Sequence, residues 1–175
     1  LRQAEFHSLD AARSDLLDPD AVGLDPGPTQ LMRGVYRHVT DRLLDGRRPA
    51  LSVRAHSDAP PGSGLGSSST MVVALVAAFS DYFGLALGEY EIAQLAYDMY
   101  SNSAKKYIGQ YIAVMGGVDA IVLTAGVGEN CDKMRRMIFA GLQPLGIKID
   151  LEKNRAGLRG EREISTDDSE VRIVI

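Results

Sequence analysis

Residues 60–79 read PPGSGLGSSSTMVVALVAAF, a glycine- and serine-rich loop that runs directly into an apolar segment. The upstream residues 50–55, ALSVRA, alternate apolar and polar side chains and predict a strand. Downstream, the apolar side chains recur at the spacing of one helical face, which predicts a helix. Its expected core positions are Val72, Leu75, Val76, Phe79 and Phe83. Strand, glycine loop and helix in this order are typical of a phosphate-binding site.

The composition of this first glycine loop suits a polyphosphate. Glycines let the backbone approach an anion, and successive N–H groups with a helix N-terminus favour negative charge. Serine hydroxyls can reach a phosphate or a bound Mg²⁺. The loop is not a Walker loop, because no Lys-Ser or Lys-Thr pair ends it. The alternative is a Gly/Ser linker, or serines that only cap a helix. A linker seldom opens with two prolines and feeds at once into a long apolar helix, which favours phosphate binding.

A second glycine segment follows in residues 118–130, VDAIVLTAGVGEN. Residues 118–124 predict a short strand of the buried type, AGVGEN predicts a turn, and residues 131–145 predict a helix. The inward positions of that helix are expected to be Met134, Ile138, Leu142 and Leu145. The glycines would let a nucleotide lie against the backbone, and Asn130 could cap the helix or bind a ligand. The alternative is a tight turn with a helix cap.

Two further helices are predicted on either side of the first loop. Residues 29–44 carry Leu31, Val35, Val39 and Leu43 at a spacing of four, and Thr29 is placed to cap their start. A second helix begins near Leu87 and stops at Gly116 and Gly117. Short strands are expected in the tail at residues 147–149, 163–165 and 171–175, and the last of them, VRIVI, would be an exposed edge. The predicted fold class is α+β, or α/β, with at least three helices packed on a small mixed sheet.

Composition limits the possible functions. The chain has 19 basic and 23 acidic residues and a net charge of −4, so there is no general electrostatic attraction to nucleic acid or to an anionic membrane. Basic pairs such as Arg135 and Arg136 are expected on solvated helix faces. The three histidines have no metal-ligand spacing, and acidic residues such as Asp167 and Asp168 are expected to be solvated. A single cysteine excludes an internal disulfide, and a cytoplasmic location is expected.

The first loop, within SDAPPGSGLGSSSTMVVAL, and the later GEYEIAQLAYD resemble the GHMP small-molecule kinases, in their heptose-phosphate kinase branch. The resemblance is assigned to residues 1–98. It implies that the loop embraces the phosphates of ATP and that Ser68 contacts Mg²⁺. The residues implied in binding are Pro61, Gly62, Ser63, Gly64, Leu65, Gly66, Ser67 and Ser68.

Residues 99–175 are similar to the C-terminal part of acetate kinase. The similarity is carried by KKYIGQYIAVMGGVDAIVLTAGVGEN, LGIKIDLEKN and ISTDDSEVRIVI. It implies that the second segment holds the adenosine end of ATP. The residues implied are Gly126, Val127, Gly128, Glu129 and Asn130. This sequence departs from that family at Ala125, where the family has glycine, and at Cys131, where it has serine.

Together the two resemblances predict a chimera of two kinase fragments, joined within a helix. The Glu that binds Mg²⁺ and the catalytic Asp of the first family have no match in this sequence. In the second family the acidic residue that binds Mg²⁺ follows the final strand, and this sequence stops just before that position. The catalytic residues are therefore unknown, and we expect an ATP- or phosphate-binding protein with an incomplete active site. Two alternatives stay open: an active kinase acting on a heptose phosphate or acetate, and a purely structural chimera without a ligand. A homo-oligomer is also possible.

Overall fold

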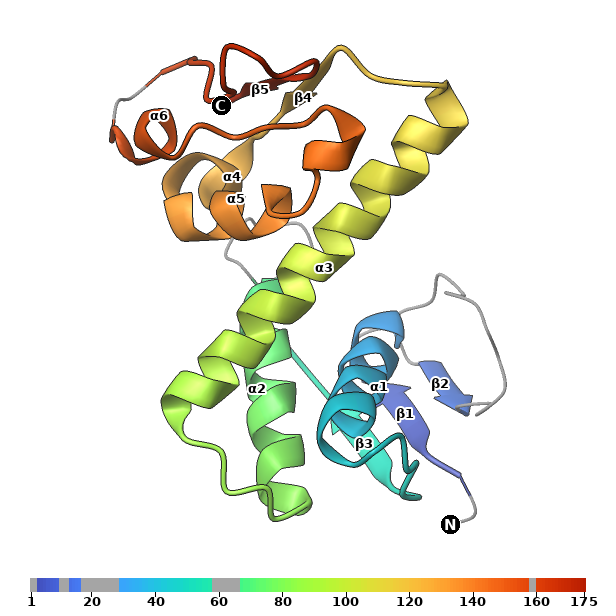
Figure 1. The fold of residues 1–175 in the computed structure, drawn as a ribbon. Coiled ribbons are helices and arrows are strands. Elements are labelled where there is room, and N and C mark those ends of the chain that lie inside the picture. Colours follow the sequence, from blue (N-terminus) through green and yellow to red (C-terminus); the bar gives the residue numbers. More distant parts are fainter. Residues whose placement is uncertain (1–2, 10–12, 17–28, 58–66, 158–159) are drawn as a thin grey trace. The chain divides into compact units, whose positions relative to one another are not determined.

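The computed structural model describes residues 3–9, 13–16, 29–57, 67–157 and 160–175. The glycines of the first loop, in residues 60–66, lie outside the described residues. The chain divides into two compact units, Leu1–Met99 and Tyr100–Ile175 (Figure 1). Each unit has its own small sheet and its own buried side chains.

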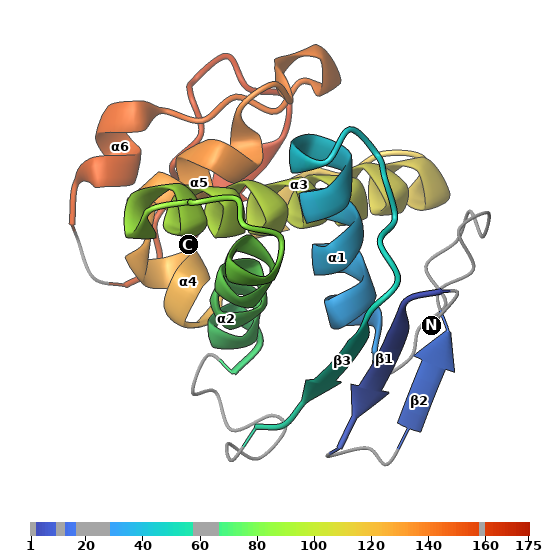
Figure 2. The same cartoon turned by 90° about the horizontal axis from the view of Figure 1, so that it is seen from below.

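The first unit contains a three-stranded mixed sheet in the order β2-β1-β3 (Figure 2). Strand β1 (Glu5–Ser8) pairs antiparallel with β2 (Arg13–Leu16) and parallel with β3 (Ser52–Ala55). Strand β3 confirms the strand predicted over residues 50–55, whereas β1 and β2 were not predicted. Helices α1 (Gln30–Leu43) and α2 (Ser67–Tyr82) pack against each other and confirm two of the predicted helices.

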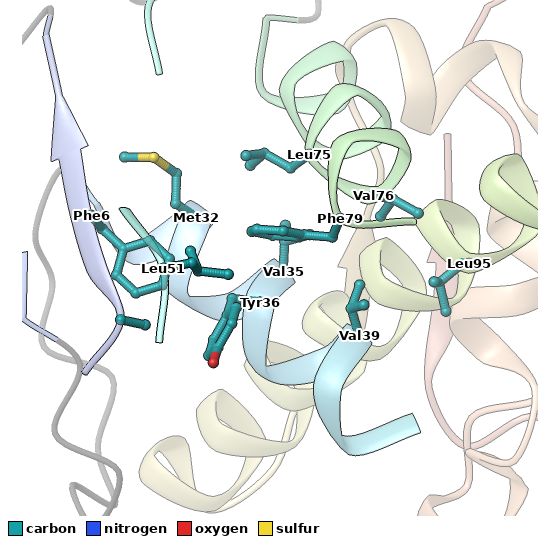
Figure 3. Close-up of a cluster of buried hydrophobic side chains, with 11 residues drawn as sticks. Phe6, Met32, Val35, Tyr36, Val39, Leu51, Leu75, Val76, Phe79 and Leu95 are labelled. Carbon is teal, nitrogen blue, oxygen red and sulfur yellow. The ribbon is translucent and has the colours of Figure 1, made fainter. Parts of the chain in front are cut away.

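The core of the first unit is built around three aromatic rings. Tyr36 makes edge-to-face contacts with Phe6 at 5.5 Å and with Phe79 at 5.7 Å between ring centroids. The Tyr36 hydroxyl donates a hydrogen bond of 2.6 Å to the carbonyl of Pro49, and burial raises the pKa of this phenol. Figure 3 shows these rings among apolar side chains from α1, α2, α3 and the residue before β3: Met32, Val35, Val39, Leu51, Leu75, Val76 and Leu95.

The buried face of α2 agrees with the sequence prediction, and that of α1 agrees only in part. Leu75, Val76 and Phe79 are buried as expected. In α1, Val35 and Val39 are buried, but Leu31 is 36% exposed while Met32 and Tyr36 point into the core. A strict spacing of four drifts away from the 3.6-residue period of a helix, so the apolar face includes the neighbouring i+1 positions. Thr29 occupies the N-cap position but its side chain makes no capping hydrogen bond.

Helix α3 (Glu89–Met115) confirms the predicted long helix and crosses the boundary between the two units. It ends at Gly116 and Gly117, whose φ angles are 74° and 138°, in the region that glycine adopts most readily. Five of the seven tyrosines of the chain lie on it. Tyr90 is 74% exposed and Tyr111 is 57% exposed. No helix in the described ranges is long and apolar enough to cross a lipid bilayer.

The second unit has a two-stranded parallel sheet, β4 (Ala120–Val122) with β5 (Arg172–Val174). Between them lie α4 (Ala125–Asn130), α5 (Asp132–Phe139), a 3₁₀ turn (Gln143–Leu145) and α6 (Leu151–Arg155). The expected tail strands near residues 149 and 163–165 form only isolated bridges. The buried apolar side chains of this unit are Met134, Ile138, Phe139, Leu142, Ile147, Ile164, Val171 and Ile173. Helices packed with small mixed and parallel sheets confirm the predicted α+β class.

Three details of the second unit correct the sequence predictions. The strand near residue 121 is not of the buried type, because Val122 is 64% exposed and, among the described strands, β4 pairs only with β5. Helix α5 ends at Phe139, not at residue 145, since Gly141 has a φ of 84° and Pro144 follows, and this leaves Leu145 48% exposed.

Strand β5 is also not the exposed edge that the sequence predicts. Strand β4 lies on one side of it. On its other side the Ile164 amide donates to the Ile173 carbonyl at 2.8 Å, and the Ile175 amide donates to the Arg162 carbonyl at 2.9 Å. The returning segment therefore covers the edge.

Candidate functional site

The second glycine segment, residues 124–130, follows β4 directly. The Leu123 amide donates to the Val174 carbonyl at 2.8 Å, which carries the sheet one residue beyond β4. Thr124 is extended, with φ −129° and ψ 173°, and the chain then enters α4. The segment is thus placed at the carboxyl end of a parallel strand, where α/β proteins commonly bind ligands.

AGVGEN forms the short helix α4, whereas the sequence predicts an open turn. The Glu129 carboxylate accepts a hydrogen bond of 2.9 Å from the Ala125 amide, one of the N–H groups that a helix start leaves unpaired. The Cys131 amide closes the helix on the Val127 carbonyl at 3.2 Å. Local hydrogen bonds within the segment therefore outweigh the low helix propensity of its two glycines.

The two glycines of α4 have different reasons to be small. A Cβ at Gly128 would lie 3.3 Å from the carbonyl carbon of Leu123 and 3.4 Å from its Cβ, so glycine lets α4 pack close to the strand end. A Cβ at Gly126 would meet no atom within 4 Å. Gly126 is exposed, so its backbone offers an open surface against which a flat ring can lie.

Ala125 carries backbone strain at the start of this helix. Its φ is 63°, in the left-handed region that costs a residue with a Cβ about 1–2 kcal/mol. This is the position at which the sequence departs from the glycine of the family that it resembles. The structure therefore gives a physical reason for glycine there, and alanine stores strain in its place.

Arg135 of α5 holds the carboxyl end of α4 from inside the protein. One terminal nitrogen, Nη1, donates to the carbonyls of Gly128 and Glu129, each at 2.9 Å. On its other edge the guanidinium donates twice to Asn154 of α6: Nε to Oδ1 at 2.6 Å and Nη2 to the carbonyl at 2.9 Å. Arg135 is 3% exposed, and burial, with the nearby charge of Arg162, lowers its pKa.

Asn154 completes this arrangement. It is 2% exposed, and its amide nitrogen donates to the Asp132 carbonyl at 3.0 Å, in the first turn of α5. Asp150 caps α6 by accepting from the amides of Glu152 at 2.8 Å and Lys153 at 2.9 Å, and these bonds lower the pKa of Asp150. Helices α4, α5 and α6 are therefore linked through one buried polar cluster.

The buried Arg135 corrects the prediction of a solvated basic pair, since only Arg136 is exposed. A sequence signal was present, because Ile138 and Phe139 lie three and four residues further along and are both buried. A charged residue at i before apolar residues at i+3 and i+4 lies on the apolar face of a helix. A prediction made only from the charge of the pair Arg135 and Arg136 misses this position on the apolar face.

The remaining candidate residues are distributed as follows. Gly126, Val127, Gly128, Glu129 and Asn130 are brought together in α4. Ser67 and Ser68 lie in the first turn of α2, and Pro61 to Gly66 lie outside the described residues. Asn130 does not cap α5, because Cys131 takes that position.

Asp167 and Asp168, which the sequence analysis expects to be solvated, lie at the surface. Asp167 pairs with Lys153 at 2.9 Å and is 99% exposed, and Asp168 pairs with Lys148 at 2.7 Å and is 73% exposed. Within the described part of the chain, no three His, Cys, Asp or Glu side chains form a group that could hold a metal ion.

Comparison with known proteins decides the family. Residues 64–175, more than half of the chain, match the family described as the acetokinase family. The chain belongs to the acetokinase family. The match includes the whole of α2, α3 and the second unit, and therefore the segment 124–130 and the arginine that holds it.

Similar curated proteins of this family are acetate kinases. The chain is 53% identical over 87 residues to acetate kinase of Corynebacterium jeikeium. This alignment covers 49% of this chain and 22% of the relative. It is 50% identical over 86 residues to acetate kinase of Methanosarcina barkeri, and this alignment covers 49% of this chain and 21% of the relative. The chain spans only about a fifth of these acetokinase-family relatives.

Solved structures similar to this acetokinase-family chain include an acetate kinase and a mevalonate kinase. Porphyromonas gingivalis acetate kinase is 37% identical, with a TM-score of 0.46 over 58% of this chain and 24% of that one. Methanococcus jannaschii mevalonate kinase is 21% identical, with a TM-score of 0.50 over 55% of this chain and 32% of that one. The second is a likeness of fold alone.

Proposed function

We propose that this chain is a nucleotide-binding fragment of phosphotransferase ancestry, and that residues 124–130 receive the adenosine end of ATP. The observation that carries the proposal is the geometry of α4. Its outer face is open at Gly126, and its inner side is fixed by the buried Arg135. Ligand sites work best where the backbone is preset by rigid packing. The membership of this segment in the acetokinase family adds support.

The residues proposed to contact the nucleotide are Gly126, Val127, Gly128, Glu129 and Asn130. Gly126 would lie against the adenosine, and the exposed Asn130 amide offers both a donor and an acceptor. The Glu129 carboxylate already accepts from the Ala125 amide, so its part would be to keep the helix start closed. A neutral, flat ring suits such an exposed backbone surface.

We propose separately that the first loop, residues Pro61 to Ser68, binds phosphate groups and Mg²⁺ within the first unit. Its glycines and serines have the chemistry that phosphate oxygens need, and Ser68 would contact the metal. Mg²⁺ keeps several waters and is usually held by one or two carboxylates besides the phosphate oxygens, so Ser68 alone would make an incomplete metal site.

We also propose that the chain is a chimera, with a GHMP-kinase-like part in residues 1–98 and an acetate-kinase-like part in residues 99–175. In favour, the curated alignments cover about half of this chain and the fold resembles a mevalonate kinase. Against this boundary, the acetokinase family match begins at residue 64, inside the first loop. The two attributions overlap over residues 64–98, so an acetokinase origin of that segment is the alternative.

The proposed function is binding with little or no turnover. The chain spans about a fifth of the acetate kinases it matches, and phosphoryl transfer needs a phosphate cradle, metal ligands and a group that orients the nucleophile. The alternatives are an active acetate or sugar-phosphate kinase and a structural chimera without a ligand. A cytoplasmic location and self-association are further proposals, the second testable by light scattering after gel filtration.

The deciding experiment is ATP binding by calorimetry, with and without Mg²⁺, on the wild type and two glycine variants. Gly126→Val adds a side chain to the open face of α4, and Gly109→Val is its matched control, because a Cβ at either glycine meets nothing within 4 Å. We expect Gly126→Val to weaken binding at least tenfold and Gly109→Val to leave it unchanged. Equal affinity in the two variants would remove residues 124–130 as the site.

Release of ADP in the presence of acetate or a heptose phosphate separates binding from catalysis. We expect no turnover above that of a heat-treated sample. Turnover that Ser68→Ala abolishes would instead establish the active-kinase alternative and place the first loop in it. Absence of any ATP binding by the wild type would leave the structural chimera.

A further inference from the structure

We propose that Arg135 is a positioning residue for the nucleotide segment, presetting its outer face from behind without touching the ligand. The inference rests on the proposed function of residues 124–130. It assigns a role to a side chain that composition places at the surface and that lies outside the glycine motif. Three observations support it: the direction of its hydrogen bonds, its burial, and the shortness of the helix that it holds.

The hydrogen bonds of Arg135 run to the two residues at the end of the motif. The guanidinium bonds the carbonyls of Gly128 and Glu129, at the end of α4, where a helix leaves its last carbonyls unpaired. These bonds fix the peptide planes on either side of Glu129. The second of these planes contains the backbone N–H and the Cα of Asn130, so it fixes the point from which the Asn130 side chain, which we propose to contact the nucleotide, extends.

The burial of Arg135 makes this attachment rigid. A guanidinium that is 3% exposed keeps its charge only because hydrogen bonds replace the lost water. Four such bonds are present, two to α4 and two to Asn154. The planar fork of arginine matches this set, whereas lysine supplies a single point of contact.

Helix α4 depends on outside support. It has six residues, two of them glycines, and begins at the strained Ala125. A helix of this length does not persist by itself in water. Without the bonds from Arg135 the segment would open while the sheet β4–β5 stays folded, since none of the hydrogen bonds of Arg135 goes to these strands.

The test compares Arg135→Lys with Arg136→Lys, a control at the exposed neighbour on the same helix. ATP affinity is measured at a temperature at which each variant is fully folded. We expect Arg135→Lys to raise the Kd for ATP at least tenfold and Arg136→Lys to change it less than twofold. Wild-type affinity in a folded Arg135→Lys protein with a lowered Tm would overturn the proposal, because the role would then be purely structural.

Amide hydrogen exchange gives a second readout, independent of binding. In Arg135→Lys we expect the Cys131 amide, which bonds the Val127 carbonyl, to exchange at least tenfold faster, while the Ile164 amide keeps its protection. Unchanged protection at Cys131 would overturn the proposal. If the wild type binds no ATP, the nucleotide site itself fails, and exchange alone decides whether Arg135 positions the segment.

Asn154→Ala covers the case in which Arg135→Lys does not fold. It removes the Oδ1 acceptor of Arg135 but leaves the guanidinium and both carbonyls in place. We expect the same two effects at smaller size, about threefold in each. No change in either quantity would contradict the positioning role.

Discussion

The helix that follows the first glycine loop, α2, and the helix that the second glycine segment forms, α4, are stabilised in opposite ways. Helix α2 has 16 residues and packs its apolar face, Leu75, Val76 and Phe79, into the core of the first unit. Helix α4 has six residues, none of them buried, and is held by a polar clamp from Arg135. An apolar face gives a helix stability that is spread over many contacts, whereas a polar clamp concentrates it in one side chain.

The largest expected effect tests the apolar side of this comparison. Phe79→Ala removes a ring that packs on Tyr36, and we expect it to lower the free energy of unfolding of the first unit by about 3–5 kcal/mol. Hydrogen exchange should show loss of protection in α1 and α2, with β4–β5 protected as before. Val73→Ala, at a 42% exposed position of the same helix, is the control and should cost less than about 0.5 kcal/mol.

The second prediction tests the polar side. Arg135→Met leaves two carbonyls of α4 and the Asn154 side chain without their donor, and we expect a loss of about 2–3 kcal/mol, measured by urea unfolding of the second unit. Arg136→Met, at the exposed neighbour, should change stability by less than about 0.5 kcal/mol. Equal losses in the two variants would show that the clamp contributes nothing of its own.

A smaller effect concerns the strain at the start of α4. Ala125→Gly relieves a left-handed φ of 63°, partly offset by the greater freedom of glycine in the unfolded chain. We expect a net gain of about 0.5 kcal/mol, seen as a higher Tm. Ala120→Gly in the adjacent strand, where no such strain exists, should lower the Tm instead. A lower Tm for both would contradict the assignment of strain.

The smallest effect is a dependence on pH. Hydrogen bonds from the α6 backbone lower the pKa of Asp150, so its contribution is fully present above the unfolded value of about 3.9. This contribution to stability is lost as the pH falls through the pKa that Asp150 has in the folded protein. Asp150→Asn still caps the helix without a charge, so we expect it to flatten the fall in Tm below about pH 4. An unchanged pH profile would assign the acid sensitivity to other carboxylates.

The sequence predictions succeed where an apolar period is long. Helices α1, α2 and α3 and strand β3 are found as predicted, and the core face of α2 is correct. The residues of the second glycine segment are placed together as its motif indicates. The roles proposed for them in nucleotide binding remain predictions, as does the chimeric origin.

The errors share a cause, which is that each of these elements depends on hydrogen bonds to residues outside it. AGVGEN folds into a helix because Glu129 and Arg135 complete its hydrogen bonds, and glycine content alone indicates a turn. The terminal strand β5 is covered because residues 162–164 return to it. Strands β1 and β2 were missed because their pairing in one sheet is visible only in three dimensions.

By itself, the sequence determined the helical periods, the two glycine loops and the membership of the second loop in a recognisable phosphotransferase segment. Only the tertiary structure decided which groups Arg135 bonds and that Gly128 must be small. The physical reason is the separation along the chain over which each kind of interaction acts. Periodicity and turn chemistry act between neighbours along the chain, whereas the hydrogen bonds of a buried guanidinium join helices brought together only by folding.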